Sequence, residues 1–414
     1  MRLTRLACAI PLAFACASTP PPSSPTAPVA ELKPPPGATA VPAASAPSEA
    51  PVAAVAPAEP AQDALPGKPP AQPLSELIQQ LSEKDRYYFS DNYVSNETSQ
   101  LQVAPLLEKL PSGGAYLGVG PEQNFSYIAL VRPEVSFIID IRRRNMLLHL
   151  LYKAIFEEAT TRSHFLTLLV GRPFQKESDP GTGATVAQVI AHAETAPRDR
   201  ELWRGIHARL IERITSGYRF PLDVADTTAL REAHQAFFDD QLDIQFELHM
   251  KTRPRYPKLR DQLAMRAPDG RELGFLASEK AFRFVQRMQA EHRIIPLVGD
   301  FAGHKALPGV AEYLRKNSIK LSVFYVSNVE EFLFEDKVWP KWVDNVTALP
   351  SDANTLFVRA WMNHHPRHPK QLDGQRTTTL IQAFSDFRAG QDHAPGWRGY
   401  RALAFDDTNK TVSN

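Results

Sequence analysis

Six short apolar runs recur along the chain, and segments with helical spacing separate several of them. Several runs are rich in β-branched and aromatic residues, which is typical of strands. Runs with apolar residues at consecutive positions suit strands that are buried on both faces of a sheet. The predicted strands cover residues 116–119, 135–141, 293–301, 319–328, 354–361 and 377–384.

Apolar residues at helical spacing predict helices between these strands. The clearest patterns lie at 124–133, 145–159 and 304–317, and the interval 160–290 carries mostly helical signals. Strand–helix–strand alternation indicates a mainly parallel sheet with helices on both faces. The sequence therefore predicts an α/β, Rossmann-like fold with a large helical insertion, about 160–290, after the second strand. Such an insertion is expected to close over the sheet edge where ligands bind.

Residues 74–110, before the first predicted strand, read as a helix, a polar stretch and a second helix. The polar stretch contains Ser95, Asn96 and Glu97. We expect Ser95 or Asn96 to cap the second helix, with Glu97 stabilised in its first turn by the helix dipole. The alternative is that this stretch forms a polar flap over a ligand.

The start of the chain has a different pattern. Arg2 and Arg5 precede a short apolar run that ends at Cys16, which resembles a bacterial lipoprotein signal peptide. The run is too short to span a bilayer. We therefore expect residues 1–16 to be a signal peptide with Cys16 as the lipidated residue of a membrane-anchored lipoprotein. By the same resemblance, Ala17 favours the outer membrane. The alternatives are ordinary cleavage nearby and a cytoplasmic protein with an apolar start.

The composition changes after this segment. Residues 17–73 consist mainly of Pro, Ala and Ser with few charges, so they bury too little apolar surface to order the backbone, and a disordered linker is expected. Residues 74–414 are long enough for a large α/β domain. The net charge of +1 provides no strong field for nucleic acid. The expected partners are a small molecule of unknown identity and, through the lipid anchor, the membrane, with no nucleic acid.

Glycines and acids follow the first three predicted strands. Gly118 and Gly120 end the first strand, Asp140 ends the second, and Asp300 ends the third. Glycine allows a tight turn and the close approach of a ligand, and an acid after the second strand can accept hydrogen bonds from ribose hydroxyls. Because the carboxyl ends of parallel strands meet at one edge, these residues predict a ligand site there.

Each of these residues also has a purely structural alternative. The two glycines would serve only to turn the chain from strand to helix. Asp140 would pair with a neighbouring arginine such as Arg142. Asp300 would cap the helix that begins near His304, and Asn124 would cap the first crossover helix.

The motifs at these strand ends resemble those of the class I S-adenosylmethionine-dependent methyltransferase fold. "YLGVGPEQN" resembles its first motif, "IIDIRR" its second and "LVGDF" its third, while "FYVSN" lies where the fourth strand meets the substrate. The resemblance covers about 113–384, apart from the helical insertion. It implies that Asp140 contacts the ribose and Asp300 the adenine. The cofactor-binding residues that it implies are Gly118, Gly120, Pro121, Asn124, Asp140, Arg142, Asp300 and Phe301, and the candidates facing a methyl acceptor are Tyr325 and Asn328.

A second, narrower resemblance to a group of proteins implies no particular reaction. "GVGPEQNFSYIA", "FIIDIRR", "GDFAG" and "SNVEEFLF" are similar to a group of uncharacterised bacterial proteins, some of which are lipoproteins. This second resemblance implies a fold and no activity.

Two residues depart from the methyltransferase pattern. The first motif of that fold usually has an acid two residues before its first glycine, in contact with the methionine end of the cofactor, whereas this chain has Tyr116. Glu122 replaces the usual third glycine. A carboxylate at this turn would repel an anionic group such as a pyrophosphate. The departure disfavours a nicotinamide-dependent oxidoreductase and leaves a ligand with a positive centre.

Other catalytic motifs are weak or missing from the sequence. The histidines of "NHHPRHP", which are His364, His365 and His368, lie in a run that prolines interrupt. A solvated loop is favoured there over a metal site, and no metal is expected. The chain contains neither a G-x-S-x-G elbow nor a GxxxxGK[ST] phosphate loop.

Two functions follow from these patterns. The first is a methyltransferase-like domain that binds a small nucleoside-type ligand at the sheet edge, with S-adenosylmethionine as the candidate cofactor. Methyl transfer depends mostly on positioning, so it needs no distinctive acid–base pair, and whether the chain is an enzyme stays open. The alternative is an exported surface lipoprotein that keeps the fold as a non-catalytic ligand- or partner-binding module. An exported location counts against a supply of S-adenosylmethionine.

Overall fold

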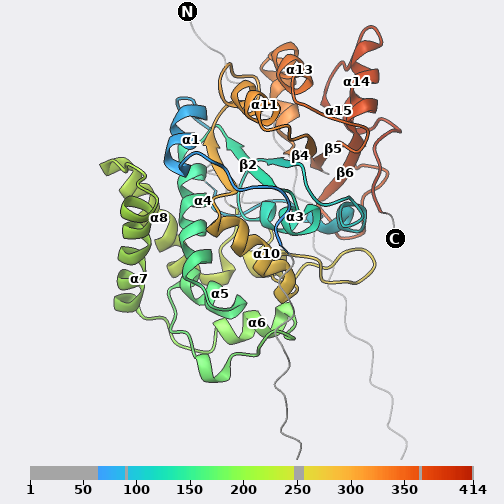
Figure 1. The fold of residues 1–414 in the computed structure, drawn as a ribbon. Helices are drawn as coiled ribbons and strands as arrows, with labels where there is room; N and C mark the ends of the chain where they lie inside the picture. The colour runs from blue at the N-terminus through green and yellow to red at the C-terminus, as the bar shows by residue number, and fades with distance from the viewer. Residues whose placement is uncertain (1–63, 89–91, 247–255, 363–365, 413–414) are drawn as a thin grey trace, which may run out of the picture. The chain divides into compact units, whose positions relative to one another are not determined.

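A sheet of six strands organises the described part of the chain (Figure 1). The computed structural model describes residues 64–88, 92–246, 256–362 and 366–412. The strand order is β3-β2-β1-β4-β5-β6, and all neighbours are parallel except β5 and β6, which are antiparallel. The strands are β1 (Ala115–Gly118), β2 (Val135–Asp140), β3 (Ile294–Val298), β4 (Leu321–Ser327), β5 (Leu356–Met362) and β6 (Thr377–Ala383). Each segment predicted as a strand forms one, which confirms the α/β prediction.

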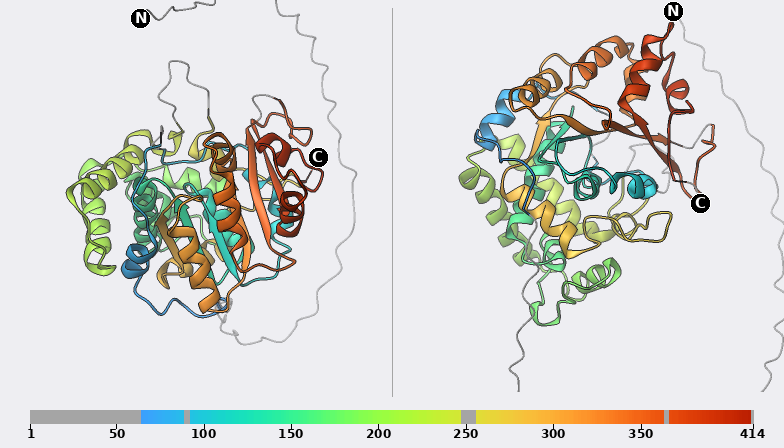
Figure 2. Two further views of the ribbon diagram at one scale, coloured as in Figure 1. Left: turned by 90° about the horizontal axis from the view of Figure 1, so that it is seen from above. Right: turned by 45° about the vertical axis from the view of Figure 1, so that its right-hand side comes forward.

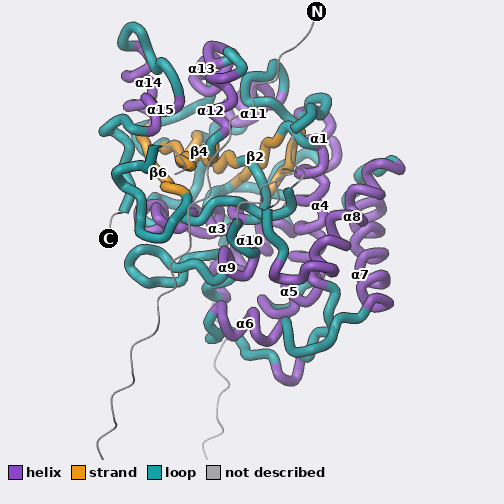
Figure 3. The backbone as a smooth tube through the Cα atoms, turned by 180° about the vertical axis from the view of Figure 1, so that it is seen from behind, coloured by secondary structure: helices purple, strands orange, loops and turns teal. Residues whose placement is uncertain are grey.

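Helices cover both faces of the sheet, as the right-hand view of Figure 2 and the tube in Figure 3 show. The helices on one face are α3 (Gln123–Val131), α4 (Arg143–Glu158) and α10 (Glu279–Ala290). Those on the other face include α11 (Ala306–Lys316), α12 (Val329–Glu335) and α13 (Trp339–Thr347). Other helices come from the two ends of the described sequence. Before β1 these are α1 (Leu74–Leu81), η1 (Gln100–Val103) and α2 (Ala104–Leu107), and after β6 they are α14 (Phe384–Asp392) and α15 (Tyr400–Ala404).

The core consists of apolar side chains between these layers. Every residue of β1, β2 and β3 is buried, as the consecutive apolar positions predicted. On one face Trp342 stacks on Phe301, with ring centroids 5.3 Å apart, and it meets Phe324 edge-on. On the other face Phe125 packs against Phe156. Each such aromatic side chain stabilises the fold by roughly 1.5–3 kcal/mol through burial.

The predicted helical insertion lies between β2 and β3. Its helices are α5 (Arg162–Val170), α6 (Val186–Ala193), α7 (Arg200–Glu212), α8 (Val224–Asp240) and α9 (Leu259–Leu263), with the short turns η2 (Lys176–Ser178), η3 (Arg213–Gly217) and η4 (Gln241–Asp243). The helices α5 and α8 pack on α4 and on each other. The insertion is therefore built outward from α4, which itself packs on β2 and β3.

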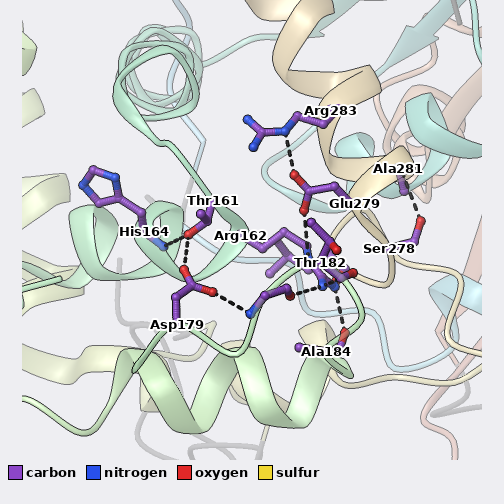
Figure 4. Close-up of polar contacts among 12 residues, drawn as sticks. Thr161, Arg162, His164, Asp179, Thr182, Ala184, Ser278, Glu279, Ala281 and Arg283 are labelled. Carbon is purple, nitrogen blue, oxygen red and sulfur yellow. Dashed lines mark hydrogen bonds and ion pairs between the residues drawn. The ribbon is translucent and has the colours of Figure 1, made fainter. Parts of the chain in front are cut away.

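A buried arginine joins separate loops of this insertion (Figure 4). Arg162 lies in the first turn of α5, and only 2% of its side chain is exposed. Its guanidinium donates hydrogen bonds of 2.8–3.1 Å to four backbone carbonyls, those of Gly181, Thr182, Ala184 and Leu276. Buried carbonyls need donors, and one planar guanidinium satisfies several of them at once.

A second buried arginine fixes α12 to the sheet. Arg359 on β5 pairs with Glu330 in the first turn of α12 at 2.7 Å, and neither side chain is exposed. The same guanidinium donates to Gln382 on β6 and to Asn409. The ion pair therefore holds the helix that follows β4 against the next two strands.

The predictions for the N-terminal part of the chain fall only partly on the described residues. The predicted signal peptide, Cys16 and most of the predicted 17–73 linker lie outside them. Within residues 64–73, Leu65 packs against the core, and the carbonyl of Pro66 accepts a 2.6 Å hydrogen bond from Arg293. Contacts with the domain thus begin before residue 74. In the described ranges no helix combines the length and apolarity that crossing a bilayer requires.

Replacing Arg359 tests the buried ion pair. Arg359→Met leaves Glu330 buried without its cation, so we expect the free energy of unfolding to fall by about 3–5 kcal/mol. Urea denaturation followed by circular dichroism measures the change. Arg144→Met is the control because it removes an exposed pair with Glu232, which is expected to cost less than about 1 kcal/mol. Similar losses in the two variants would contradict the prediction.

Candidate functional site

A cavity of about 260 Å³ lies at the carboxyl ends of β1, β2, β3 and β4. The strand order reverses between β1 and β4, which is where ligands bind in open α/β sheets. Its volume is close to the lower end of the range of roughly 300–1,000 Å³ for ligand pockets. Eight of the predicted site residues line it: Gly120, Pro121, Asp140, Arg142, Asp300, Phe301, Tyr325 and Asn328.

The other two predicted residues, Gly118 and Asn124, build the wall from behind. The Asn124 amide donates hydrogen bonds to the carbonyls of Val119, Gly120 and Pro121 at 2.9, 3.1 and 2.7 Å. The structural alternative of a helix cap at Asn124 is therefore wrong, because its side chain donates to the preceding turn and no side-chain cap is present on α3.

Tyr116 supports the same asparagine. Its hydroxyl donates to Asn124 Oδ1 at 2.8 Å, and its side chain is buried. Gly118 must be small because a Cβ atom there would lie 2.0 Å from Asn124 Oδ1. Tyr116 lies where the similar methyltransferase motif usually has an acid, and here it supports the turn through Asn124.

Gly120 has a different role from Gly118. Its φ is +76°, a conformation that favours glycine, and a Cβ atom there would meet nothing within 4 Å. Its carbonyl accepts hydrogen bonds from Asn145 and from His149 Nε2, the latter at 2.8 Å. Gly120 therefore leaves the cavity open on one side while helix α4 holds its backbone on the other.

His149 was not predicted as a site residue. Burial lowers the pKa of His149 to about 4, so the ring is neutral at pH 7 and Nε2 carries the proton that it donates to Gly120. Within the described residues, its Nδ1 has no hydrogen-bond partner. A lone histidine on an apolar helix carries little sequence signal, which explains the omission.

Asp140 is paired with Arg142, as the structural alternative stated. Its Oδ1 accepts hydrogen bonds from the backbone N and the Nε of Arg142, both at 2.9 Å, and its Oδ2 accepts one from Nη2 at 2.7 Å. Burial alone would raise the pKa of Asp140, but the Arg142 charge and hydrogen bonds outweigh it and lower that pKa. Asp140 is therefore ionised at neutral pH and also lines the cavity.

Asp300 is paired as well, but it does not cap a helix as the structural alternative proposed. Its carboxylate forms an ion pair with Arg86 and accepts the N–H of Ala302 at 2.9 Å. The cap of α11 comes from Glu83, whose Oε1 accepts the N–H groups of Lys305 and Ala306 at 2.9 and 2.8 Å. The capping alternative for Asp300 is wrong because Glu83, which is far from this helix in sequence, provides the carboxylate at the helix end.

Glu97 lies in the cavity wall rather than in a helix, so the expected capping arrangement is wrong here too. Its Oε1 accepts hydrogen bonds from Tyr325 at 2.5 Å and Ser327 at 2.6 Å, and its Oε2 accepts one from Gln123 at 3.2 Å. Burial raises the pKa of Glu97, and these three hydrogen bonds oppose the rise. Ser95 and Asn96 line the same cavity, which fits the alternative of a polar flap.

Glu122 is oriented differently from the sequence-based expectation. It does not line the cavity, and its Oε1 accepts the N–H of Ser95 at 3.2 Å. Burial raises the pKa of Glu122 to about 7. In the described part of the chain, its Oε2 has no hydrogen-bond partner. The predicted repulsion of an anionic ligand by Glu122 therefore loses its geometric basis.

Aromatic residues contribute to the lining of the cavity. Tyr88 and Phe332 meet edge-to-face with centroids 5.8 Å apart, and the Arg142 guanidinium lies 5.7 Å from the centroid of the Tyr88 ring. The helical insertion contributes only Phe246 to the described lining. The described residues of the insertion therefore do not show the expected closure over the edge, whereas eight residues within 86–88 and 92–97 line the cavity.

The histidine run does not form the expected solvated loop at His368. This side chain is buried, its Nε2 lies 3.2 Å from the carbonyl of Ala404, and its Nδ1 accepts the N–H of Lys370. His364 and His365 lie outside the described residues. Among the residues that can be described, no group of three or more His, Cys, Asp or Glu is arranged to hold a metal ion.

The sheet and most of the cavity lining fall within a known family. A family model described as a domain of unknown function, DUF7790, matches residues 92–412. The chain belongs to the DUF7790 family. The DUF7790 match contains all six strands and Glu97, whereas Glu83 and Arg86 precede it. A search of curated proteins finds no match.

The buried carboxyl of Glu122 makes stability in this DUF7790 domain depend on pH. Because its pKa is raised from 4.5 to about 7, its stabilising contribution is complete below about pH 4.5 and is lost as the pH rises through 7. Glu122→Gln removes this dependence. We expect the variant to gain about 3 kcal/mol relative to the wild type between pH 4.5 and 8.

Urea denaturation at several pH values measures this gain. Glu232→Gln removes one exposed carboxylate and is the control for the change in net charge. If the free energies of unfolding of Glu122→Gln and the wild type differ by a constant amount from pH 4.5 to 8, Glu122 does not titrate as its burial requires.

Proposed function

We propose that the chain binds a small nucleoside-type molecule in this cavity, with S-adenosylmethionine as the candidate cofactor. The observation that carries the proposal is that Gly120, Asp140 and Asp300 follow three separate strands and line one cavity. Such a combination at the switch point of a parallel sheet is the usual arrangement for nucleotide recognition. The sequence motifs that resemble those of class I methyltransferases lie at the same edge of the sheet.

The two acids keep some capacity for a ligand although each is paired. A carboxylate oxygen offers about two acceptor positions. Oδ1 of Asp140 accepts two hydrogen bonds from Arg142, whereas Oδ2 accepts one. Oδ2 thus has a position for a ribose hydroxyl. Asp300 would face the adenine, and the half-buried rings of Tyr88 and Phe332, which line the cavity, would provide an apolar surface for the base.

Any methyl transfer here would depend on positioning. S-adenosylmethionine would supply the methyl group on its sulfonium, and the protein would have to align an acceptor with it. Burial raises the pKa of Tyr325 well above its usual value, so this hydroxyl stays protonated; its proton is donated to Glu97, and its oxygen can accept a hydrogen bond from a ligand. Asn328 donates to Glu331 at 3.1 Å and lines the cavity. Tyr325 and Asn328 would therefore orient an acceptor rather than deprotonate it.

A non-catalytic module is the second candidate function. It is favoured by the arginines that already neutralise Asp140 and Asp300, and by Tyr116, which is buried where methyltransferases usually have an acid. In this version the chain is an exported lipoprotein, anchored to the outer membrane through Cys16, that uses the cavity for binding alone. The proposal for the cavity is the same, and only the reaction differs.

Calorimetric titration of S-adenosylmethionine and S-adenosylhomocysteine into the purified protein tests ligand binding. Asp140→Asn removes a charged acceptor but keeps the side-chain shape, so we expect affinity to fall about tenfold or more. Glu232→Gln is the matched control because its carboxylate pairs with Arg144 outside the cavity lining. If neither compound binds the wild type, the nucleoside proposal is wrong.

A further inference from the structure

We infer that the ligand of this cavity carries a cationic group, such as a primary ammonium, and that the carboxylate of Glu97 binds it. This inference rests on the proposed function and specifies the chemistry at one end of the ligand. It would apply to S-adenosylmethionine, to its demethylated product and to other nucleosides with an amino-bearing side chain.

Glu97 is a buried acid whose side-chain hydrogen-bond partners among the described residues are all neutral. Its side chain lines the cavity although the residue is only 1% exposed. Tyr325, Ser327 and Gln123 are its hydrogen-bond partners within the described residues, and none of them carries a positive charge. Removing a carboxylate from water costs several kcal/mol, and proteins usually compensate with a cation. The cavity is the open side from which such a cation can come.

The carboxylate of Glu97 also has room for another donor. Two hydroxyl groups occupy Oε1, whereas Gln123 is the one donor to Oε2. With about two acceptor positions on each oxygen, Oε2 keeps one position for a donor from a ligand. An ammonium group supplies both the missing proton donor and the missing positive charge.

The backbone beside Glu97 is unusual in a way that serves this contact. Ser327 ends β4 with a φ of +52°, which is uncommon for a residue other than glycine. The pairing of β4 with β5 is also irregular between Tyr325 and Ser327. The hydroxyl groups of Tyr325 and Ser327 both donate hydrogen bonds to Oε1 of Glu97. Strain of this kind concentrates at ligand sites.

The other charges that line the cavity balance one another. Arg142 pairs with Asp140 and Arg86 pairs with Asp300. Two lining carboxylates, Glu97 and the exposed Asp336, have no ion pair among the described residues. The net charge of the described lining is therefore negative when Glu97 is ionised, which favours a cationic ligand group and disfavours an anionic one.

The spacing of the strands gives the required shape of the ligand. Asp140 ends β2, whereas Tyr325 and Ser327 belong to β4, and only β1 lies between these two strands. Neighbouring strands are about 4.8 Å apart, so the two ends of the site are separated by roughly 10 Å. A nucleoside at Asp140 with a short chain that ends in an ammonium group can reach Glu97.

Calorimetry with two related nucleosides tests this inference. S-adenosylhomocysteine carries the amino-acid tail, and methylthioadenosine lacks it. We expect the wild-type protein to bind S-adenosylhomocysteine at least about tenfold more tightly. In Glu97→Gln, affinity for S-adenosylhomocysteine should fall by about 10- to 100-fold while affinity for methylthioadenosine stays unchanged. A loss would identify the ammonium as the bound group, because removing the Glu97 charge would strengthen the binding of the tail's carboxylate.

Glu122→Gln is the matched control, since it removes a nearby buried carboxyl that lies outside the cavity lining. It should bind both compounds as the wild type does. Equal affinity of the wild type for both compounds would overturn the inference and leave the proposed function intact, even if Glu97→Gln failed to fold. Equal losses for both compounds in Glu97→Gln would also overturn it. No binding of either compound would instead overturn the proposed function.

Discussion

The side chain of Asn124 is the interaction on which the cavity depends. Its amide donates to three successive carbonyls of the β1–α3 turn, and its oxygen accepts the hydroxyl of Tyr116. A buried amide that is satisfied on both sides fixes the backbone around it. Gly118 must lack a side chain to admit Asn124, and Gly120 can then present an open backbone to the cavity. The same glycines that suggest a ligand turn are therefore also required by the internal packing.

Local patterns were sufficient to predict the sheet and the edge at which the candidate site residues meet. The strands are continuous apolar runs because both of their faces are covered, and parallel strands necessarily bring Gly120, Asp140 and Asp300 to one side. The same reasoning failed for the helix caps that were expected at Ser95 or Asn96 and offered as a structural alternative for Asp300. Capping rules consider only neighbours in sequence, whereas these side chains found partners elsewhere in the fold, such as Gln123 and Arg86.

Two buried glutamates show a further limit of motif reasoning. Glu122 lies within the first motif, so the sequence predicts that its carboxylate faces the ligand. In the structure Glu122 does not line the cavity, and its carboxylate accepts the N–H of Ser95. Glu97 lies in a polar stretch without a motif, and it becomes part of the cavity wall through contacts with Tyr325 and Ser327 on β4. Position in a motif fixes the backbone, and tertiary packing decides the direction of the side chain. A glutamate carboxyl group does line the cavity, but Glu97 supplies it rather than Glu122.

The two ends of the cavity differ in how their charges are compensated. Asp140 is held ionised by Arg142, whose guanidinium remains charged at every relevant pH. A ligand at that end adds hydrogen bonds to a pair that is already neutral, so it gains orientation and hydrogen-bond energy but no new ion pair. Glu97 has only neutral partners among the described residues, so a cation there gains the Coulomb energy of a buried pair without displacing another cation. Discrimination between ligands should therefore arise mainly at the Glu97 end, while the Asp140 end sets their orientation.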